Sequence, residues 1–253
     1  HMELLDRRPA CAAHAVIGDV TDAARMSAVF ERFRPDIVFH AAAHKHVPLM
    51  EENPCEAIKN NVTGTRVLAE TAERYAVGRF IFVSTDKAVN PVNAMGASKR
   101  LAELVVRGRT SRTATTFAAV RFGNVLGSNG SVVPRFLEQI RGGGPVTVTH
   151  PEVRRYFMLI PEAVQLVLHA AAQAENGAIY VLEMGEQVKL VDMARHLIRL
   201  SGFVPDEEIA ITFIGLRPGE KLREELVGGS ESVRPSRVEK ILRVIDGGRP
   251  DAE

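Results

Sequence analysis

The sequence predicts an α/β fold in which a doubly wound parallel sheet is joined to a smaller C-terminal substrate lobe. Three observations predict it. Short apolar runs alternate with amphipathic segments along most of the chain, which is typical of parallel strands linked by helices. Of the 253 residues, 45% are hydrophobic and 25% charged, as in ordinary globular proteins. Small or polar residues follow several apolar runs, as expected where strands end at a ligand site.

The first half of the chain is expected to form the sheet and its covering helices. Pro54 suits the first turn of a helix, because the amide hydrogen that proline lacks would stay unbonded there. In chain order we expect a strand at 15–17, a helix at 22–33, a strand at 36–40, a helix from 53 to about 75, a strand at 79–84, a helix at 98–107 and a strand at 116–121.

The sequence pattern changes in the second half of the chain, where we expect shorter elements. In order we expect a loop at 123–130, a helix at 132–141, a strand at 146–149, a helix at 161–174, a strand at 179–184, a helix at 188–201 and a strand at 209–213. After Gly228 and Gly229 the chain becomes polar, and we expect residues 246–253 to fray.

Charge and cysteine content argue against several function classes. The net charge is +1 without a long run of Lys or Arg, so we expect no nucleic-acid partner. No apolar stretch approaches the roughly 18 residues of a membrane span. The two cysteines, Cys11 and Cys55, argue against a disulfide framework or a cysteine-rich metal site. These features favour a cytoplasmic protein.

The candidate ligand site lies where the strands end, because ligands of doubly wound sheets bind outside the carboxyl ends of the strands. The segments at those positions are 18–19, 41–46, 84–87 and 122–124, and polar groups gather in them.

A glycine-rich turn for a dinucleotide is missing from the sequence. Neither GxGxxG nor GxxGxxG occurs, and the glycines at 142–144 precede a proline and a strand instead of a helix. His1 and Met2 resemble the remnant of a tag and cloning site. We therefore expect the sheet to lack its first strand-helix-strand unit.

Residues 84–99 (STDKAVNPVNAMGASK) carry the strongest chemical signal. The strand before them ends in a hydroxyl pair, and an acid and a base, Asp86 and Lys87, follow side by side. To act as a general base, Lys87 must lose its proton near neutral pH, through burial or a neighbouring positive charge. The alternative is an ordinary surface Asp–Lys pair in a turn.

Six segments in order resemble one enzyme family. They are GDVTD at 18–22, HAAAHKHVPLME at 40–51, NNVTGT at 60–65, the segment 84–99, RFGNVLGSNGSVVPRF at 121–136 and LRPGEKLREEL at 216–226. Together they resemble the UDP-N-acetylglucosamine 4,6-dehydratases of bacterial polysaccharide biosynthesis, in the extended short-chain dehydrogenase/reductase superfamily. The resemblance implies a Rossmann-like NAD-binding domain, truncated at its start, over 1–122 and about 155–185. It implies a UDP-sugar-binding lobe over 123–154 and about 186–245.

The resemblance also implies a reaction, the NAD-dependent dehydration of UDP-N-acetylglucosamine to a UDP-4-keto-6-deoxy-N-acetylhexosamine. Asp86 would protonate the departing C6 hydroxyl, Lys87 would take the C5 proton, and Thr85 would lie beside the C4 oxygen. Met95 stands where the superfamily usually has tyrosine, which is similar to a subgroup that retains the C5 configuration. Because a thioether does not ionise, the alternative interpretation of Met95 is an inactive enzyme. Lys99 would bond the nicotinamide ribose.

Binding residues follow from the same resemblance. Those for the cofactor are Asp19, Val20, Ala41, Ala42, Ala43, Lys45, Asn61 and Lys99. Those for the UDP-sugar are Lys45, Asn124, Ser131, Val133, Pro134, Arg155, Arg217 and Glu220. Arginine suits a diphosphate, and Arg217 precedes an expected helix whose N-terminal amides would share the charge. His44 and His46 lack a third ligand, so we expect no metal.

Two other functions stay open. One is a 4-epimerase on the same scaffold, although such enzymes usually keep the tyrosine and need no adjacent acid–base pair. The other is a non-catalytic nucleotide-sugar-binding fragment without the pyrophosphate loop. The resemblance suggests a homo-oligomer, a role in making capsule or lipopolysaccharide, and an origin as the cytoplasmic domain of a membrane-anchored protein.

Overall fold

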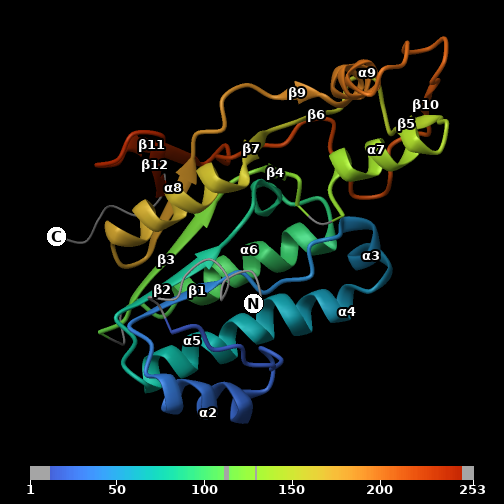
Figure 1. Cartoon of the computed structure of the whole chain (residues 1–253). Coiled ribbons are helices and arrows are strands. Elements are labelled where there is room, and N and C mark those ends of the chain that lie inside the picture. Colours follow the sequence, from blue (N-terminus) through green and yellow to red (C-terminus); the bar gives the residue numbers. More distant parts are fainter. Residues whose placement is uncertain (1–11, 111–113, 129, 247–253) are drawn as a thin grey trace.

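A six-stranded sheet forms the centre of the computed structural model, which describes residues 12–110, 114–128 and 130–246. The strand order is β1-β2-β3-β8-β12-β11 (Figure 1). The first four strands pair in parallel and are β1 (Ile37–His40), β2 (Arg79–Val83), β3 (Thr116–Arg121) and β8 (Ala178–Leu182). The antiparallel strands β12 (Ile241–Asp246) and β11 (Glu231–Pro235) extend this sheet. The predicted α/β fold with a parallel sheet is therefore confirmed.

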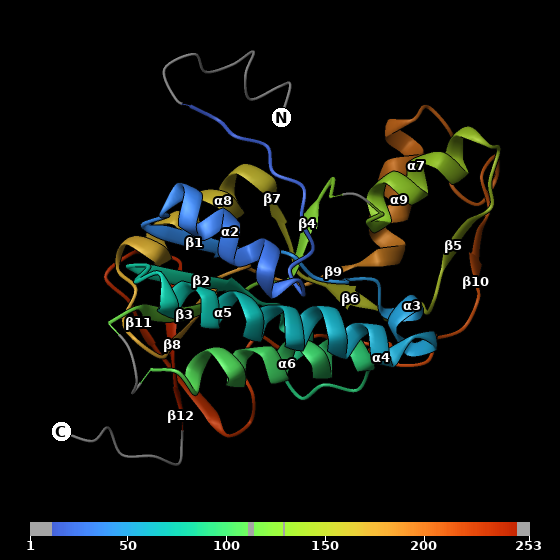
Figure 2. The same ribbon diagram turned by 90° about the horizontal axis from the view of Figure 1, so that it is seen from below.

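Helices cover both faces of the sheet, as a doubly wound fold requires (Figures 1 and 2). One face carries α2 (Ala23–Phe33), α5 (Gly64–Arg74) and α6 (Ala94–Arg107), and the other carries α8 (Ile160–Ala172). Phe80 and Phe82 pack toward the three-helix side, whereas Ile81 between them packs toward α8. Because β2, β3 and β8 are buried on both faces, these strands read as continuous apolar runs in the sequence.

A second group of elements has its own core. It consists of α7 (Val132–Arg141), α9 (Leu190–Leu200), β5 (Val146–Val148) and β10 (Ile211–Phe213), packed around buried side chains that include Phe136 and Ile198. Two short pairs run between this group and the main sheet: β4 (Asn124–Leu126) with β7 (Phe157–Leu159), and β6 (Arg154–Arg155) with β9 (Val188–Lys189). The predicted domain boundaries remain a proposal; β11 and β12, within the range predicted for the sugar lobe, belong to the main sheet.

Most expected elements are confirmed to within two residues at their ends. The helix expected at 98–107 begins earlier, at Ala94, because the Asn93 side chain accepts a hydrogen bond from the amide of Gly96 and caps it. The helix expected from 53 to about 75 is built from α4 (Pro54–Ala57), a π-helical stretch (Ile58–Thr63) and α5. The helix α3 (Val47–Glu52) was not predicted.

Three expectations from the sequence are wrong, and one segment without a predicted strand forms two strands. Residues 15–17 form no strand, and Ile17 is 94% exposed, because no described strand lies beside them to pair with. The loop expected at 123–130 contains β4, which pairs with β7. Turns and bends replace the helix expected after Arg217, so helix amides are not available to it. The polar segment after Gly229 forms β11 and β12. Fraying was expected at residues 246–253. Asp246 is the last residue of β12, and the others lie outside the described ranges.

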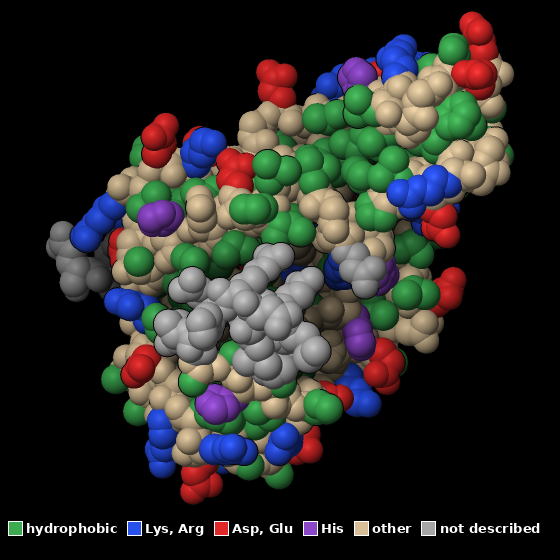
Figure 3. Space-filling view, viewed as in Figure 1, with side chains coloured by type: hydrophobic (Ala, Val, Ile, Leu, Met, Phe, Trp, Pro, Cys, Tyr) green, Lys and Arg blue, Asp and Glu red, His purple; other side chains and the backbone are tan. Residues whose placement is uncertain are grey.

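Charged side chains of both signs are interspersed around the rim of the face in Figure 3, and hydrophobic side chains gather over α7 and its neighbours. Over the described ranges, every helix is too short or too polar to cross a membrane.

Candidate functional site

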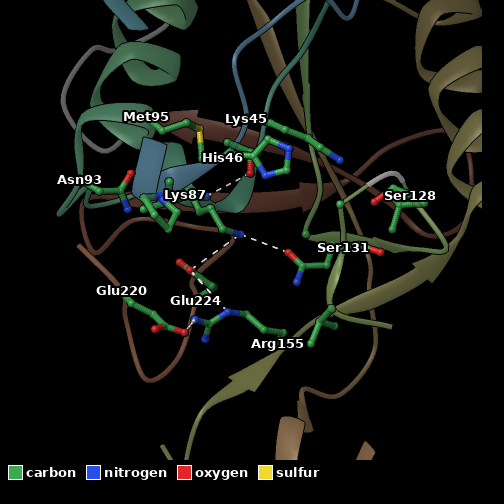
Figure 4. A pocket seen from close by; sticks show the side chains of 18 of the residues that line it. Lys45, His46, Lys87, Asn93, Met95, Ser128, Ser131, Arg155, Glu220 and Glu224 are labelled. Carbon is green, nitrogen blue, oxygen red and sulfur yellow. Dashed lines mark hydrogen bonds and ion pairs between the residues drawn. The ribbon is translucent and has the colours of Figure 1, made fainter. Parts of the chain in front are cut away.

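Three of the four polar segments that follow strands meet in one cavity of about 520 Å³. Residues from 41–46 after β1, from 84–87 after β2 and from 122–124 after β3 line one side of it. In Figure 4, Lys87 lies at the centre, with Lys45 and His46 on one side of it and Arg155, Glu220 and Glu224 on the other. The fourth segment, 18–19, does not line the cavity.

The predicted site residues divide into two sets. Those that line the cavity are Ala41, Ala43, Lys45, Thr85, Lys87, Met95, Lys99, Asn124, Ser131, Arg155, Arg217 and Glu220. Those outside its lining are Asp19, Val20, Ala42, Asn61, Asp86, Val133 and Pro134. The Asp19 carboxylate accepts hydrogen bonds from the amide and hydroxyl of Thr21, which lower its pKa. Among the residues that the structure describes, no group of three or more His, Cys, Asp or Glu side chains is arranged to hold a metal ion.

The Asp86–Lys87 pair lies on a short 3-10 turn (Asp86–Ala88) directly after β2. Lys87 Nζ donates to Asp86 Oδ1 at 3.0 Å and to Asn124 Oδ1 at 3.2 Å. Thr85 caps this turn, and its hydroxyl donates to the same Asp86 oxygen at 2.9 Å. The alternative of an ordinary surface pair is wrong, because the Asp86 side chain is 0% exposed.

Asp86 reaches the cavity only through its neighbours. Its Oδ2 is buried and has no hydrogen-bond partner among the described residues. Gly123 packs against this oxygen: a Cβ on Gly123 would lie 3.0 Å from Asp86 Oδ2 and 2.8 Å from Tyr156 Cβ. Thr85 and Lys87, which both bond Oδ1, line the cavity, so either can pass a proton between Asp86 and a ligand.

Gly96 allows α6 to pack directly against the backbone of this acid–base segment. A Cβ on Gly96 would overlap the carbonyl oxygen of Lys87. We therefore expect Gly96→Ala to lower the free energy of unfolding by about 1–3 kcal/mol, as overpacking does. Urea unfolding measures the loss. Gly142→Ala is the matched control, because a Cβ there meets its nearest atoms at an ordinary 3.5 Å; equal losses in the two variants would contradict the prediction.

Lys99 and Asn61 hold together the side of the cavity that follows β1 and β2. Lys99 Nζ donates to the carbonyl oxygen of Val83 at 2.6 Å and lies 3.9 Å from the centre of the Phe82 ring. Burial lowers the pKa of Lys99 to about 7. Asn61 bonds the amide and carbonyl groups of His44 and the hydroxyl of Ser98, so it ties the loop after β1 to α6.

Replacing Lys99 with methionine is expected to stabilise the protein most at low pH. Below pH 7 the folded protein buries an ammonium ion that the unfolded chain keeps solvated. Between about pH 7 and the ordinary value of 10.5, the unfolded chain binds more protons at this site, so wild-type stability rises with pH. Lys99→Met should therefore raise the free energy of unfolding by a few kcal/mol in order of magnitude at low pH, and this gain should shrink between about pH 7 and 10.5. Urea unfolding across the window tests this, and a constant advantage would contradict it.

Arg155 and Glu220 form a buried pair on the opposite wall. Arg155 donates to Glu220 Oε1 at 3.1 Å, and Thr149 donates to the same oxygen at 2.9 Å. The backbone amide of Arg217 donates to Glu220 Oε2 at 3.3 Å. Glu220 is therefore already bonded to protein donors, whereas the side chain of Arg217 borders the cavity.

Sequence reasoning missed three charged residues at or beneath the site. Glu224 lines the cavity and is 4% exposed. Glu103 and Arg121 are both 0% exposed and pair with each other, and Glu103 also accepts from the hydroxyl of Ser84 at the start of the acid–base segment. Arg121 could have been noticed because it is a charged residue at the end of the apolar strand β3. Nothing in the local sequence marks Glu224 apart from its place in the segment 216–226.

Comparison with known proteins shows a family for most of this chain. The profile of the family described as "Polysaccharide biosynthesis protein" matches residues 2–246. The capsular polysaccharide biosynthesis protein CapD of Staphylococcus aureus is 57% identical over 230 residues, which cover 90% of this chain and 38% of that protein. A UDP-glucose 4-epimerase of Rickettsia massiliae is 38% identical over 217 residues, covering 85% of this chain and 62% of the relative. The chain thus spans less than two thirds of either relative.

Solved structures share the fold. Pen from Bacillus thuringiensis superposes with a TM-score of 0.83 at 35% identity, covering 91% of this chain and 71% of Pen. DesIV from Streptomyces venezuelae, a dTDP-glucose 4,6-dehydratase solved with NAD bound, has a TM-score of 0.76 at 22% identity, with 84% and 70% covered. At that identity the second likeness shows the fold alone, and the predicted Rossmann-like architecture is confirmed.

Proposed function

The chain belongs to the polysaccharide biosynthesis protein family, and from this membership we propose that it carries the acid–base and UDP-sugar-binding residues of an NAD-dependent UDP-N-acetylglucosamine 4,6-dehydratase. The observation that carries the proposal is the Asp86–Lys87–Thr85 cluster at the end of β2, facing a cavity large enough for a sugar nucleotide. An epimerase needs no such adjacent pair.

The residues on the β1 and β2 side fit the nicotinamide ribose of NAD. The described residues provide one hydrogen-bond acceptor for the buried Lys99 ammonium, the carbonyl oxygen of Val83, so two of its three donors stay available for ribose hydroxyls. Ala41 and Ala43 leave room beside it, because their side chains are single methyl groups. When bound, NAD supplies reversible hydride acceptance. The family resemblance also assigns Lys45 to this region, and Lys45 lines the cavity.

Lys87 and Asp86 can complete one cycle of water loss without an external acid or base. Lys87, as the neutral amine, takes the C5 proton, and the C6 oxygen leaves with a proton that Asp86 supplies through Thr85. One water results. Because Lys87 Nζ and Asp86 Oδ1 lie 3.0 Å apart, the proton gained by Lys87 can then return to Asp86 and restore both groups.

Met95 favours a dehydratase that works without the usual phenolate. Its side chain lines the cavity and is 4% exposed, packed with Met50 and Ala57. The Thr85 hydroxyl then passes the C4 proton to the Asp86 carboxylate, because Thr85 lines the cavity and bonds Asp86 Oδ1. Retention at C5 is proposed from the resemblance of Met95 to the subgroup that retains this configuration.

The opposite wall is expected to bind the diphosphate of UDP. Arg217 lines the cavity, and its guanidinium group can bind phosphate oxygens bidentately. Removing it by Arg217→Ala should weaken UDP binding about tenfold, as expected for the loss of a charged hydrogen bond. Isothermal titration calorimetry with UDP measures this. Arg223→Ala is the matched control, because Arg223 is exposed and does not line the cavity; equal weakening by both changes would refute the assignment.

The proposed reaction is tested by incubating UDP-N-acetylglucosamine and NAD with this chain and with the protein extended to the length of its relatives. A product lighter by one water in the mass spectrum supports the dehydratase. A product of unchanged mass with inverted C4 supports the epimerase, which the Rickettsia relative favours. If the extended protein binds UDP but forms neither product, the result supports the alternative of a non-catalytic nucleotide-sugar-binding protein. Cytoplasmic location and homo-oligomerisation stay predictions.

A further inference from the structure

We propose that Glu224 is a positioning residue that acts as the second carboxylate partner of Lys87 and, with Asp86, sets the pH at which this lysine loses its proton. The inference rests on the proposed function only in taking Lys87 as the base. The electrostatic coupling between the two side chains is independent of turnover.

Three side chains from three parts of the chain surround the Lys87 ammonium. Asp86 Oδ1 and Asn124 Oδ1 accept its hydrogen bonds at 3.0 and 3.2 Å. Glu224 Oε1 lies 3.8 Å from Nζ and supplies the second negative charge (Figure 4). Two hydrogen bonds and one ion pair therefore hold the Lys87 side chain in the cavity.

Glu224 is held where it stands. Its carbonyl oxygen accepts a hydrogen bond from Gln187 Nε2 at 2.7 Å, and the carbonyl oxygen of Leu222 accepts from the amide of Arg154 at 2.8 Å. The segment that carries Glu224 is therefore tethered to the β6–β9 pair. These bonds fix the backbone at Glu224, and the ion pairs with Lys87 and Arg155 hold its carboxylate on the cavity side.

The burial of Glu224 is compensated by cations. Its side chain is 3% exposed, and Oε2 has no hydrogen-bond partner among the described residues. The cations nearest to it are Lys87, at 3.8 Å, and Arg155, whose Nε lies 3.9 Å from Oε1. A buried carboxylate needs such pairing. Burial raises the pKa of Glu224, with Asp86 acting in the same direction and Lys87, Arg155 and Lys221 opposing it.

Removing the charge of Glu224 should therefore release the Lys87 proton at lower pH. An opposite charge within about 4–6 Å favours the charged form of a group by roughly 1–3 pH units. The remaining charges around the pair are Asp86, bonded to Lys87, Arg155 with its partner Glu220, and Lys221. With Glu224→Gln the cluster loses one negative charge, while the size and shape of the side chain are kept.

The test is competitive acetylation of the lysines with acetic anhydride across a pH series, because only the neutral amine reacts. Mass spectrometry of the peptide that contains Lys87 gives the midpoint of its labelling, and the exposed Lys59 is the internal reference. We expect Glu224→Gln to lower the Lys87 midpoint by about one pH unit or more. The matched control is Glu225→Gln, because Glu225 is exposed, bonds Asn90 and does not line the cavity. The midpoint of Lys87 labelling in this variant should equal that of the wild type.

Coincident midpoints in the wild type and Glu224→Gln would overturn the proposal, as would an equal shift in Glu225→Gln. If Glu224→Gln does not fold, Glu224→Asp decides, because it draws the carboxylate back by one methylene and must also lower the midpoint; an unchanged midpoint overturns the proposal. Labelling needs no turnover, so its outcome stands apart from that of the dehydration assay.

Discussion

Lys87→Met is expected to abolish water loss from UDP-N-acetylglucosamine while UDP binding stays largely intact. Methionine has nearly the length of lysine but carries no proton acceptor for C5. A positioned acid or base contributes about 10²–10⁴-fold to a rate, so we expect turnover to fall at least about 100-fold. Binding should persist because the change leaves in place Arg155 and Arg217, the lining residues proposed for the diphosphate. Mass spectrometry of the sugar nucleotide and calorimetry with UDP measure the two effects.

The Lys87→Met experiment needs a control for folding, because the change leaves Asp86 buried without its cation. Circular dichroism should show that the variant is folded at the assay temperature. Lys240→Met removes a charge from an exposed pair with Glu162, away from the cavity, and should leave turnover unchanged. Retained turnover in Lys87→Met would rule out Lys87 as the base.

The sheet and the location of the site were predictable because both follow from local sequence. The strands β2, β3 and β8 are buried on both faces, so each is an uninterrupted apolar run. Their parallel order then places the following residues at one edge of the sheet. This is why Lys45, Thr85 and Asn124, far apart in the chain, could be assigned to one site before the structure was known.

The wrong expectations concern contacts that local pattern does not contain. Residues 15–17 are apolar enough for a strand, but a strand also needs a neighbour, and no described strand pairs with them. The segment after Gly229 is polar, yet it adds β11 and β12 to the sheet. Glu231 there bonds the buried Arg121, so a charge that made the segment look exposed is part of what holds it in place.

Only part of the chemistry of the site could be predicted from the sequence. The adjacency of Asp86 and Lys87 is visible in the sequence, but the burial of Asp86 also depends on Gly123, which packs against its Oδ2 atom. The charge of Glu224 reaches Lys87 because the segment after β10 folds across the cavity without forming the expected helix. The burial of Asp86 and the distance between Glu224 and Lys87 both arise from tertiary packing.

Arg121→Met is expected to lower the free energy of unfolding by about 3–5 kcal/mol, because it leaves buried carboxylates without their cation. Arg121 Nε lies 2.8 Å from Glu103 Oε1, and both side chains are 0% exposed. Arg121 also holds Glu231 at 2.7 Å, so the change removes the charge that joins β3 to β11. Urea unfolding measures the loss, and Lys59→Met, in an exposed pair with Glu56, should cost under about 1 kcal/mol.

Combining Arg121→Met with Glu103→Leu separates a lost attraction from an uncompensated charge. The double variant no longer buries an unpaired Glu103 carboxylate, and Arg100, 3.5 Å from Glu231, still balances that residue. We therefore expect the double variant to be more stable than Arg121→Met alone, as happens when a buried ion pair is replaced by apolar side chains of similar volume. If the losses of Arg121→Met and Glu103→Leu simply added, the coupling between the two side chains would be zero, and an uncompensated Glu103 charge would not explain the loss in Arg121→Met.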